Sequence, residues 1–210
     1  MMTKCLLFDC DGTLVDSEQL CNLGIVMKFD ELGIKLDAEQ LMIKYRGWEL
    51  AKIFEELSLT FGISLPSNFV TEYRSTVAAL FESELLPIAG IKAALDQLPY
   101  PKAVVSNGPA HKTAQALKLC GLSDYFGPHI YSAYDIGVWK PDPRIYQFAA
   151  KDMGFDDENC IVIEDGLVGV EAGYKAGMQT LFYNPFNQEC SLPSVVSFNN
   201  MGELPELIKG

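Results

Sequence analysis

The stretch CLLFDCDGTLVDS, residues 5–17, begins with four apolar residues and turns polar at Asp9. A short apolar run bounded in this way is typical of a strand buried in a sheet, with a polar loop at its carboxyl end. Two later strands follow the same pattern: AVV (103–105), which precedes Ser106 and Asn107, and CIVI (160–163), which precedes Glu164 and Asp165. Three predicted strands therefore each end in polar side chains.

The chain around these strands alternates between helix and strand patterns. Apolar residues recur at helical spacing in residues 91–98, 109–120, 143–153 and 168–176 and again around 204–207, and further short strands are predicted at 130–132 and 180–183. Strands that alternate with helices favour a parallel sheet covered by helices. The predicted fold class is therefore α/β, with a Rossmann-like parallel sheet.

Residues 16–86 break this alternation. They show helical periodicity only, enough for about four helices, and Asp37 with Gln40 fits a capping box at the start of one of them. This block lies between the first strand and the rest of the sheet. The sequence thus predicts a core built from residues 1–15 and 87–210, with an inserted all-helical domain at 16–86.

Composition excludes several classes of partner. The formal net charge is -12, hydrophobic residues make up 49% and charged residues 21% of the 210 positions. An acidic surface repels nucleic acid and anionic lipid, so neither is expected to bind. The six cysteines lack metal-ligand spacing, and we see neither a signal peptide nor an apolar run of transmembrane length. These features predict a cytoplasmic protein with reduced cysteines.

The polar strand ends predict a reactive site. In an open parallel sheet the ligand crevice lies beyond the carboxyl ends of the strands, where four carboxylates would meet: Asp9, Asp11, Glu164 and Asp165. Like charges at such distances repel, and a hard divalent cation with oxygen ligands relieves the repulsion. Lys140, in the segment WKPDP, adds positive charge. A magnesium site that attracts an anion is the resulting expectation.

At this point the residues resemble a known family. DCDGTLVDS (9–17) resembles the DxDGT signature of the haloacid dehalogenase superfamily, and its other three motifs are similar to SNG (106–108), Lys140 in KPDP, and EDGLVG (164–169). All four occur in the family's order over essentially the whole chain. The inserted helical block resembles the family's small helical cap.

The resemblance implies a role for each matching residue. Asp9 would attack phosphorus and form an aspartyl phosphate, and Asp11 would serve as general acid and then as general base. Lys140 would neutralise charge, while the phosphate would bind to Gly12, Ser106 and Asn107. The magnesium ligands would be Asp9, Asp11 through its backbone carbonyl, Asp165 and, directly or through water, Glu164. Because haloacid-cleaving members lack an acid/base at the position of Asp11, its presence favours phosphoryl chemistry.

The helical block would select the substrate. Its segment KYRGWEL (44–50) resembles the family's substrate-selecting loop, in which Arg46 could pair with a second anionic group of the substrate. Tyr45, Trp48 and Lys52 could contribute, or could simply be packed aromatics and a surface base. Lys112 could reach the phosphate, although a surface lysine is its default interpretation.

Three functions remain open from the sequence. The leading one is a phosphatase for a small sugar or sugar-acid phosphate. DSExxC, YDIxxWKPDP and LPEL (204–207) resemble the family's bacterial 6-phosphogluconate phosphatases, which makes 6-phosphogluconate the candidate substrate. The alternative is a β-phosphoglucomutase-like sugar phosphomutase, disfavoured because several such enzymes have a histidine where this chain has Cys21. A non-catalytic metabolite-binding protein would be expected to lack a key residue. The expected assembly is a monomer or a weak homo-oligomer.

Overall fold

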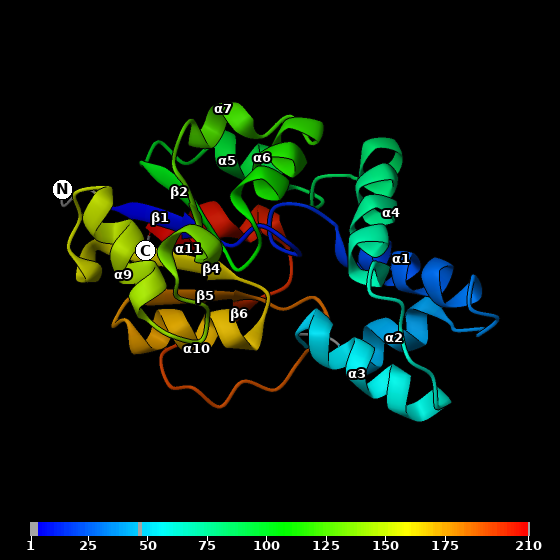
Figure 1. The fold of residues 1–210 in the computed structure, drawn as a ribbon. Coiled ribbons are helices and arrows are strands. Elements are labelled where there is room, and N and C mark those ends of the chain that lie inside the picture. Colours follow the sequence, from blue (N-terminus) through cyan, green and yellow to red (C-terminus); the bar gives the residue numbers. More distant parts are fainter. Residues whose placement is uncertain (1–3, 46–47, 210) are drawn as a thin grey trace. The chain divides into compact units, whose positions relative to one another are not determined.

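The computed structural model describes residues 4–45 and 48–209 and contains one parallel sheet. The strand order is β3-β2-β1-β4-β5-β6 (Figure 1). The strands are β1 (Cys5–Phe8), β2 (Lys102–Ser106), β3 (Ile130–Ser132), β4 (Cys160–Glu164), β5 (Gln179–Tyr183) and β6 (Val196–Phe198). All neighbouring strands pair in parallel, which confirms the predicted α/β class.

Two layers of helices cover this sheet, one on each face (Figure 1). Contacts with the strands place α9 (Arg144–Asp152) and α10 (Leu167–Lys175) on one face. The other layer contains α5 (Ile91–Asp96), α6 (Ala110–Leu119), α7 (Ser123–Phe126) and α11 (Leu204–Lys209). The crossovers change face at β1, so β1 lies at the topological switch point where parallel sheets bind ligands.

The strand β6 and two short helices were not predicted from the sequence. In β6 the first two residues are exposed and only Phe198 is buried, so no continuous apolar run marks this three-residue edge strand. The helices α7 and α8 (Ala133–Ile136) have four residues each, as one-turn elements that show no helical periodicity. Two 3₁₀ turns, η1 (Asp157–Asn159) and η2 (Met201–Glu203), complete the element list.

The chain divides into two compact units, one formed by Met1–Asp16 with Leu86–Gly210 and the other by Ser17–Leu85. We call them the core unit and the helical unit. The chain leaves and re-enters the core unit at neighbouring positions, because the Asp16 backbone N–H donates to the Leu86 carbonyl and the Ile88 N–H donates to Leu14. A short antiparallel bridge between Val15 and Pro87 joins the same two segments.

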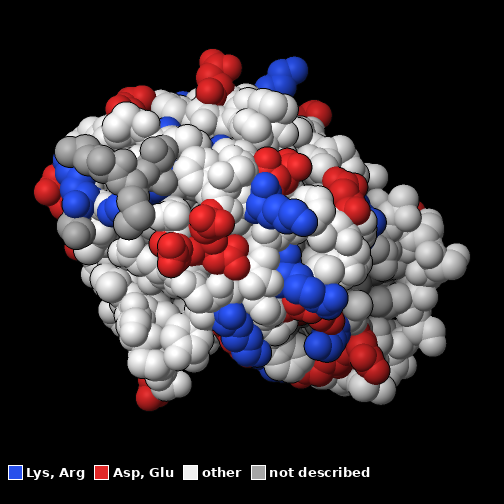
Figure 2. Space-filling model, turned by 90° about the vertical axis from the view of Figure 1, so that its left-hand side faces the viewer, with Lys and Arg blue, Asp and Glu red and all other residues white. Residues whose placement is uncertain are grey.

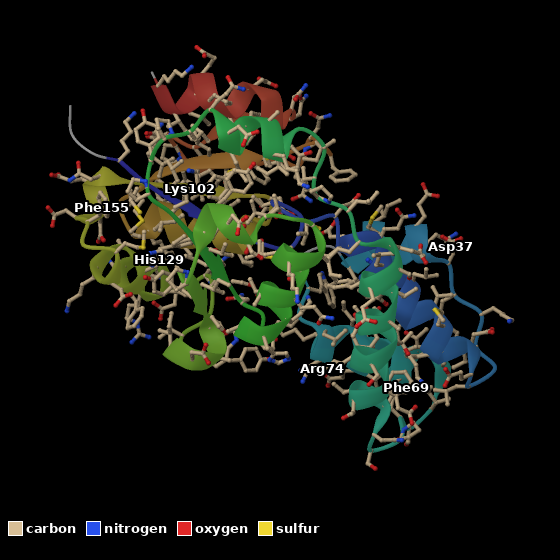
Figure 3. The ribbon with its side chains drawn as sticks, turned by 90° about the horizontal axis from the view of Figure 1, so that it is seen from above. Asp37, Phe69, Arg74, Lys102, His129 and Phe155 are labelled. Atoms are coloured by element: carbon tan, nitrogen blue, oxygen red, sulfur yellow. The ribbon has the colours of Figure 1, made fainter. Side chains whose placement is uncertain are left out.

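The helical unit contains α1 (Glu18–Asp30), α2 (Ala38–Tyr45), α3 (Leu50–Phe61) and α4 (Phe69–Glu84). The centre of this unit is aromatic. The ring of Phe54 packs edge to face on the rings of Phe69 and Tyr73, with distances between ring centres of 5.2 Å and 5.3 Å. Figure 3 marks Phe69 and Asp37 on this unit. The Gln40 N–H donates to the Asp37 carboxylate at 2.8 Å, which confirms the predicted cap of α2.

The described surface carries mixed charge. On the face shown in Figure 2, Lys and Arg side chains lie among Asp and Glu side chains. Among the described residues, no helix is long and apolar enough to cross a membrane. The six cysteines are all free, and four of them are buried: Cys5, Cys10, Cys120 and Cys160.

Candidate active site

A buried lysine joins the carboxyl ends of β1, β2 and β4. The Lys140 ammonium lies 2.5 Å from Asp9 Oδ1 and 2.5 Å from Glu164 Oε1, and it donates to the Val105 carbonyl at 2.8 Å. These three partners occupy all three N–H bonds of the ammonium. Lys140 is 7% exposed and Asp9 is 9% exposed. A pair of carboxylates is thus held around one desolvated cation.

The pKa values in this cluster are shifted by burial and by charge. Burial, followed by the negative charge of Glu164, raises the pKa of Asp9 to about 7, although Lys140 opposes the shift. Burial acts to lower the pKa of Lys140, but the charges and hydrogen bonds of Asp9 and Glu164 raise it above its usual range. The cluster therefore combines a permanent cation with a carboxyl group that titrates near neutrality.

Glu164 is buried, and both of its carboxylate oxygens accept hydrogen bonds. It is 2% exposed, and its Oε1 accepts a hydrogen bond from the Tyr146 hydroxyl at 2.6 Å. Burial and the charge of Glu164 raise the pKa of Tyr146, which keeps its hydroxyl a donor. The Lys140 ammonium lies 5.2 Å from the centre of the Tyr146 ring. Sequence reasoning missed Tyr146, whose only sequence signal was a polar group on the buried face of a predicted helix.

Gly12 allows the loop after β1 to pass against Asp165. Its φ is +85°, and a Cβ built there would lie 2.2 Å from Asp165 Oδ2. Asp165 also accepts a hydrogen bond from the Thr13 hydroxyl at 2.8 Å. A side chain at position 12 would meet both the backbone constraint and the carboxylate, so glycine is required for steric reasons.

The loop after β2 is tied to the segment that carries Lys140. The Lys140 N–H donates to Asn107 Oδ1 at 2.9 Å, so the Asn107 side chain positions this segment. The Ser106 hydroxyl accepts from the Gly108 N–H at 2.9 Å, and the Ser132 hydroxyl donates to the Gly108 carbonyl at 2.7 Å. Ser106 and Asn107 therefore lie at the same edge of the sheet as Asp9.

The Asp11 side chain contacts Lys112. The Lys112 ammonium lies 3.2 Å from Asp11 Oδ1 and 3.1 Å from Asp11 Oδ2. Both side chains are about one-third exposed, at 32% for Lys112 and 33% for Asp11. Lys112, for which a surface lysine is the default interpretation, is thus partly exposed and contacts a candidate catalytic carboxylate.

Three carboxylates are close enough to share a cation. One ligand atom from each of Asp9, Glu164 and Asp165 lies within 4.8 Å of the others. Hard oxygen donors of this kind suit Mg²⁺ or Ca²⁺, and a set of few protein ligands suits Mg²⁺, which retains water in its coordination shell. The donor set therefore fits a magnesium ion.

The predicted substrate loop is described only in part. Arg46 lies outside the described residues. Tyr45, at the end of α2, is 3% exposed and packs edge to face on the half-exposed Trp48 at 5.5 Å. The Lys52 ammonium lies 3.3 Å from Glu49 in an exposed pair. Tyr45 is thus part of the core of the helical unit, while Trp48 retains an exposed surface.

A hollow elsewhere on the core unit holds none of these residues. It is lined by Gln147, Lys151, Gly154, Phe155, Asp156, Asp157, Glu158 and Gly177. Residues 156–158 of its lining come just before β4, so the hollow lies at the end of the sheet where the strands begin; Figure 3 labels Phe155 of the hollow and Lys102, the first residue of β2. That end is opposite to the carboxyl ends of the strands, so the hollow is separate from the Asp9 cluster.

Gly169 offers a stability test of the packing around Glu164. A Cβ at position 169, within α10, would lie 1.8 Å from Glu164 Oε1. A glycine-to-alanine change inside a helix normally stabilises it, yet here the overpacking is expected to lower the free energy of unfolding by about 1–3 kcal/mol. Chemical denaturation measures this change. The matched control is Gly166→Ala, whose Cβ would be 3.8 Å from Glu164; an equal effect of both variants would contradict the steric explanation.

Comparisons with known proteins agree with this geometry. The model of the haloacid dehalogenase-like hydrolase family matches residues 3–177. The 6-phosphogluconate phosphatase of Escherichia coli (strain K12) is 40% identical over 209 residues, which cover 98% of this chain and 95% of that protein.

Solved structures share the fold over almost the entire chain. A conserved haloacid dehalogenase-like protein of unknown function from Agrobacterium tumefaciens str. C58 has a TM-score of 0.86 at 27% identity, with 99% of this chain and 98% of that chain covered. A family hydrolase from Deinococcus radiodurans R1, solved with bound phosphate and sodium, has a TM-score of 0.81 at 25% identity, with 99% and 95% covered.

The chain belongs to the haloacid dehalogenase-like hydrolase family, as its four motifs predicted. With a relative at 40% identity that is a phosphatase, it is a phosphatase of that family.

Proposed function

We propose that this phosphatase hydrolyses the phosphate monoester of a small sugar or sugar acid, with 6-phosphogluconate as the first candidate, through an aspartyl phosphate on Asp9. The observation that carries the proposal is the buried Asp9 carboxylate, 2.5 Å from the Lys140 ammonium and grouped with Glu164 and Asp165. The name of the 40% identical relative supports the candidate substrate.

In the first step a carboxylate oxygen of Asp9 forms a bond to phosphorus while the bond between phosphorus and the sugar oxygen breaks. Asp11 donates its proton to the departing oxygen, so the sugar leaves as a neutral alcohol. In the second step a water molecule attacks phosphorus as Asp11 removes its proton. The bond between Asp9 and phosphorus then breaks, which releases inorganic phosphate and restores the Asp9 carboxylate.

Other side chains stabilise the charge of the transferring group. Phosphoryl transfer depends mainly on positioning and on neutralising the equatorial oxygens. Lys140 supplies a fixed positive charge beside Asp9, and the Ser106 hydroxyl with the backbone N–H groups near Gly12 and Asn107 supplies hydrogen bonds. Asp9, the Asp11 carbonyl, Glu164 and Asp165 would hold Mg²⁺. That ion supplies charge neutralisation when it is bound.

The test is a phosphate-release screen over phosphorylated metabolites, with and without Mg²⁺. We expect sugar-acid phosphates to be the best substrates and chelation to reduce release to background. Hexose monophosphates with a bisphosphate primer separate the rival reaction: isomer formation with little free phosphate would contradict the hydrolase and indicate a phosphomutase. Binding without any turnover across the panel would contradict an enzyme.

Magnesium affinity is expected to weaken below about pH 7. Since the pKa of Asp9 is raised to about 7 in the metal-free protein, Asp9 holds a proton below that pH, and a cation must displace it. The apparent affinity should therefore fall by up to about tenfold for each pH unit below 7. Isothermal titration calorimetry between pH 6 and pH 8 measures it. An Asp9→Asn control should bind more weakly and without this slope, and a constant wild-type affinity would refute the assignment of Asp9 as ligand.

The helical unit is proposed to select the substrate through Arg46. The variant Arg46→Ala should weaken the binding of sugar-acid phosphates more than the binding of simple aryl phosphates. Only the sugar-acid phosphates carry a second anionic group with which the guanidinium can pair. Steady-state kinetics on one substrate of each class measure the difference. Lys35→Ala is the matched control, since Lys35 is an exposed base of the helical unit that pairs with Asp30. Equal losses on both classes would remove Arg46 from substrate selection.

A further inference from the structure

The two aspartates of the loop after β1 each contact a different lysine. Lys140 is buried and contacts Asp9, whereas Lys112 is partly exposed and contacts Asp11. Lys112 belongs to the first turn of α6, which begins directly after the SNG motif. The Asp11 carboxylate is thus connected to an element that is distant in the sequence but adjacent in the core unit.

The contact is symmetric and geometrically defined. Both carboxylate oxygens of Asp11 lie within 3.2 Å of the same ammonium. A Cβ built on Gly108 would lie 3.9 Å from Asp11 Oδ2, so the backbone before α6 flanks the carboxylate from the same direction. The Asp11 backbone is fixed in turn, since the neighbouring Gly12 N–H donates to the Val15 carbonyl at 2.8 Å. Backbone and side-chain contacts therefore restrict the orientation of this carboxylate.

We infer that Lys112 is a positioning residue for Asp11: its ammonium, in contact with both oxygens of the carboxylate, fixes the orientation of the group. When Asp11 is protonated, one oxygen still accepts from Lys112, and the other gives its proton to the leaving oxygen. The inference rests on the proposed role of Asp11 as general acid. A general acid acts only from within hydrogen-bond distance of the oxygen it protonates, so a carboxylate that rotates freely spends much of its time out of reach. Lys112 acts in this proposal through its contact with Asp11.

This role has a signature that depends on the leaving group. A 4-nitrophenolate leaves without much help from an acid, whereas phenolate and the alkoxide of a sugar need a proton as the bond breaks. Because kcat/KM reports the steps up to the first irreversible one, it measures the transfer to Asp9. A positioning defect at Asp11 should therefore reduce kcat/KM most for the poorest leaving group.

The experiment compares Lys112→Met, Lys112→Arg and Lys118→Met on 4-nitrophenyl phosphate, phenyl phosphate and 6-phosphogluconate. Lys118 is the matched control, as an exposed lysine at the other end of α6. Lys112→Met should lose about tenfold in kcat/KM on the poor leaving groups, which equals about 1.4 kcal/mol, and less than about threefold on 4-nitrophenyl phosphate. Lys112→Arg should recover most of the loss, and Lys118→Met should match the wild type. Circular dichroism and thermal unfolding check that each variant is folded.

A loss of equal size on all three substrates, or no loss on any, would overturn the inference. The variant Asp11→Asn separates this failure from failure of the proposed function. If Asp11→Asn shows the leaving-group dependence and Lys112→Met does not, only the role of Lys112 is overturned. If Asp11→Asn itself shows no such dependence, Asp11 is not the general acid, and both the proposed mechanism and the inference are overturned.

Discussion

Asp9→Asn should reduce phosphate release by at least about 10⁴-fold, the scale seen when a nucleophile is removed from a catalytic unit. The substitution keeps the size of the side chain but replaces a carboxylate oxygen with an amide, which is a poor nucleophile. Phosphate release from 6-phosphogluconate under saturating Mg²⁺ measures the change. Labelling with a radioactive phosphate donor followed by acid quenching should detect a phosphorylated wild-type protein and no label on the variant.

Stability gives this prediction an internal control. Because burial and Glu164 make ionisation of Asp9 unfavourable, a neutral asparagine should leave the thermal midpoint of the metal-free protein unchanged or higher. Asp124→Asn, an exposed aspartate of α7, is the matched control and should keep full activity. Residual turnover above about 1% in a pure preparation of Asp9→Asn would refute the nucleophile assignment, since it lies far above the expected scale.

Lys140→Met should lower activity by at least about 10²–10³-fold, as expected when a preorganised charge donor is removed. It also leaves Asp9 and Glu164 facing each other without the ammonium that bridges them. Removing one partner of a buried ion pair costs about 3–5 kcal/mol. In the metal-free protein the loss of stability should fall below this range, because Asp9 can take up a proton and so relieve the repulsion.

The two effects of Lys140→Met can be separated by adding Mg²⁺. The cation should restore much of the lost thermal stability, since it neutralises the same carboxylates, yet it should not restore turnover. Lys175→Met on α10 is the control, because Lys175 pairs with Glu171 at the surface, where an ion pair contributes little. Recovery of full activity with Mg²⁺ alone would show that Lys140 has no role beyond neutralising the cluster.

Much of the sheet could be predicted because a buried strand appears in the sequence as a short continuous run of apolar residues. The runs at 5–8, 103–106 and 160–164 are almost entirely buried, so their apolar residues are continuous in the sequence. β6 has no such apolar run, because Val196 and Ser197 are exposed at the edge of the sheet. The cap of α2 at Asp37 was also predictable, as it involves residues only three positions apart.

The candidate site could be predicted only where the polar residue ends a strand or follows one directly. Asp9 directly follows β1, whereas Ser106 and Glu164 are the last residues of β2 and β4, and all three lie at the carboxyl ends of adjacent strands. Lys112 lies in a helix, where a polar residue usually faces solvent, and nothing in a sequence window distinguishes it from a surface side chain. Tyr146 lies on the buried face of a predicted helix, but a sequence window does not show what its hydroxyl contacts. Only their partners, Glu164 and Asp11, show that they belong to the site.

The sequence by itself determined the class of fold, the order of the four motifs and the carboxylates available for chemistry. The pattern of apolar residues and the position where a strand ends can both be recognised from residues that are close together in the sequence. The tertiary structure decided which of those groups meet. Lys140 and Asp9 are 131 positions apart, and Lys112 and Asp11 are 101 positions apart. Each contact depends on the strand order that places β2 and β4 on either side of β1. The pairing of Lys140 with Asp9 and of Lys112 with Asp11 follows from that order, because strand pairing brings residues that are distant in the sequence within hydrogen-bond distance.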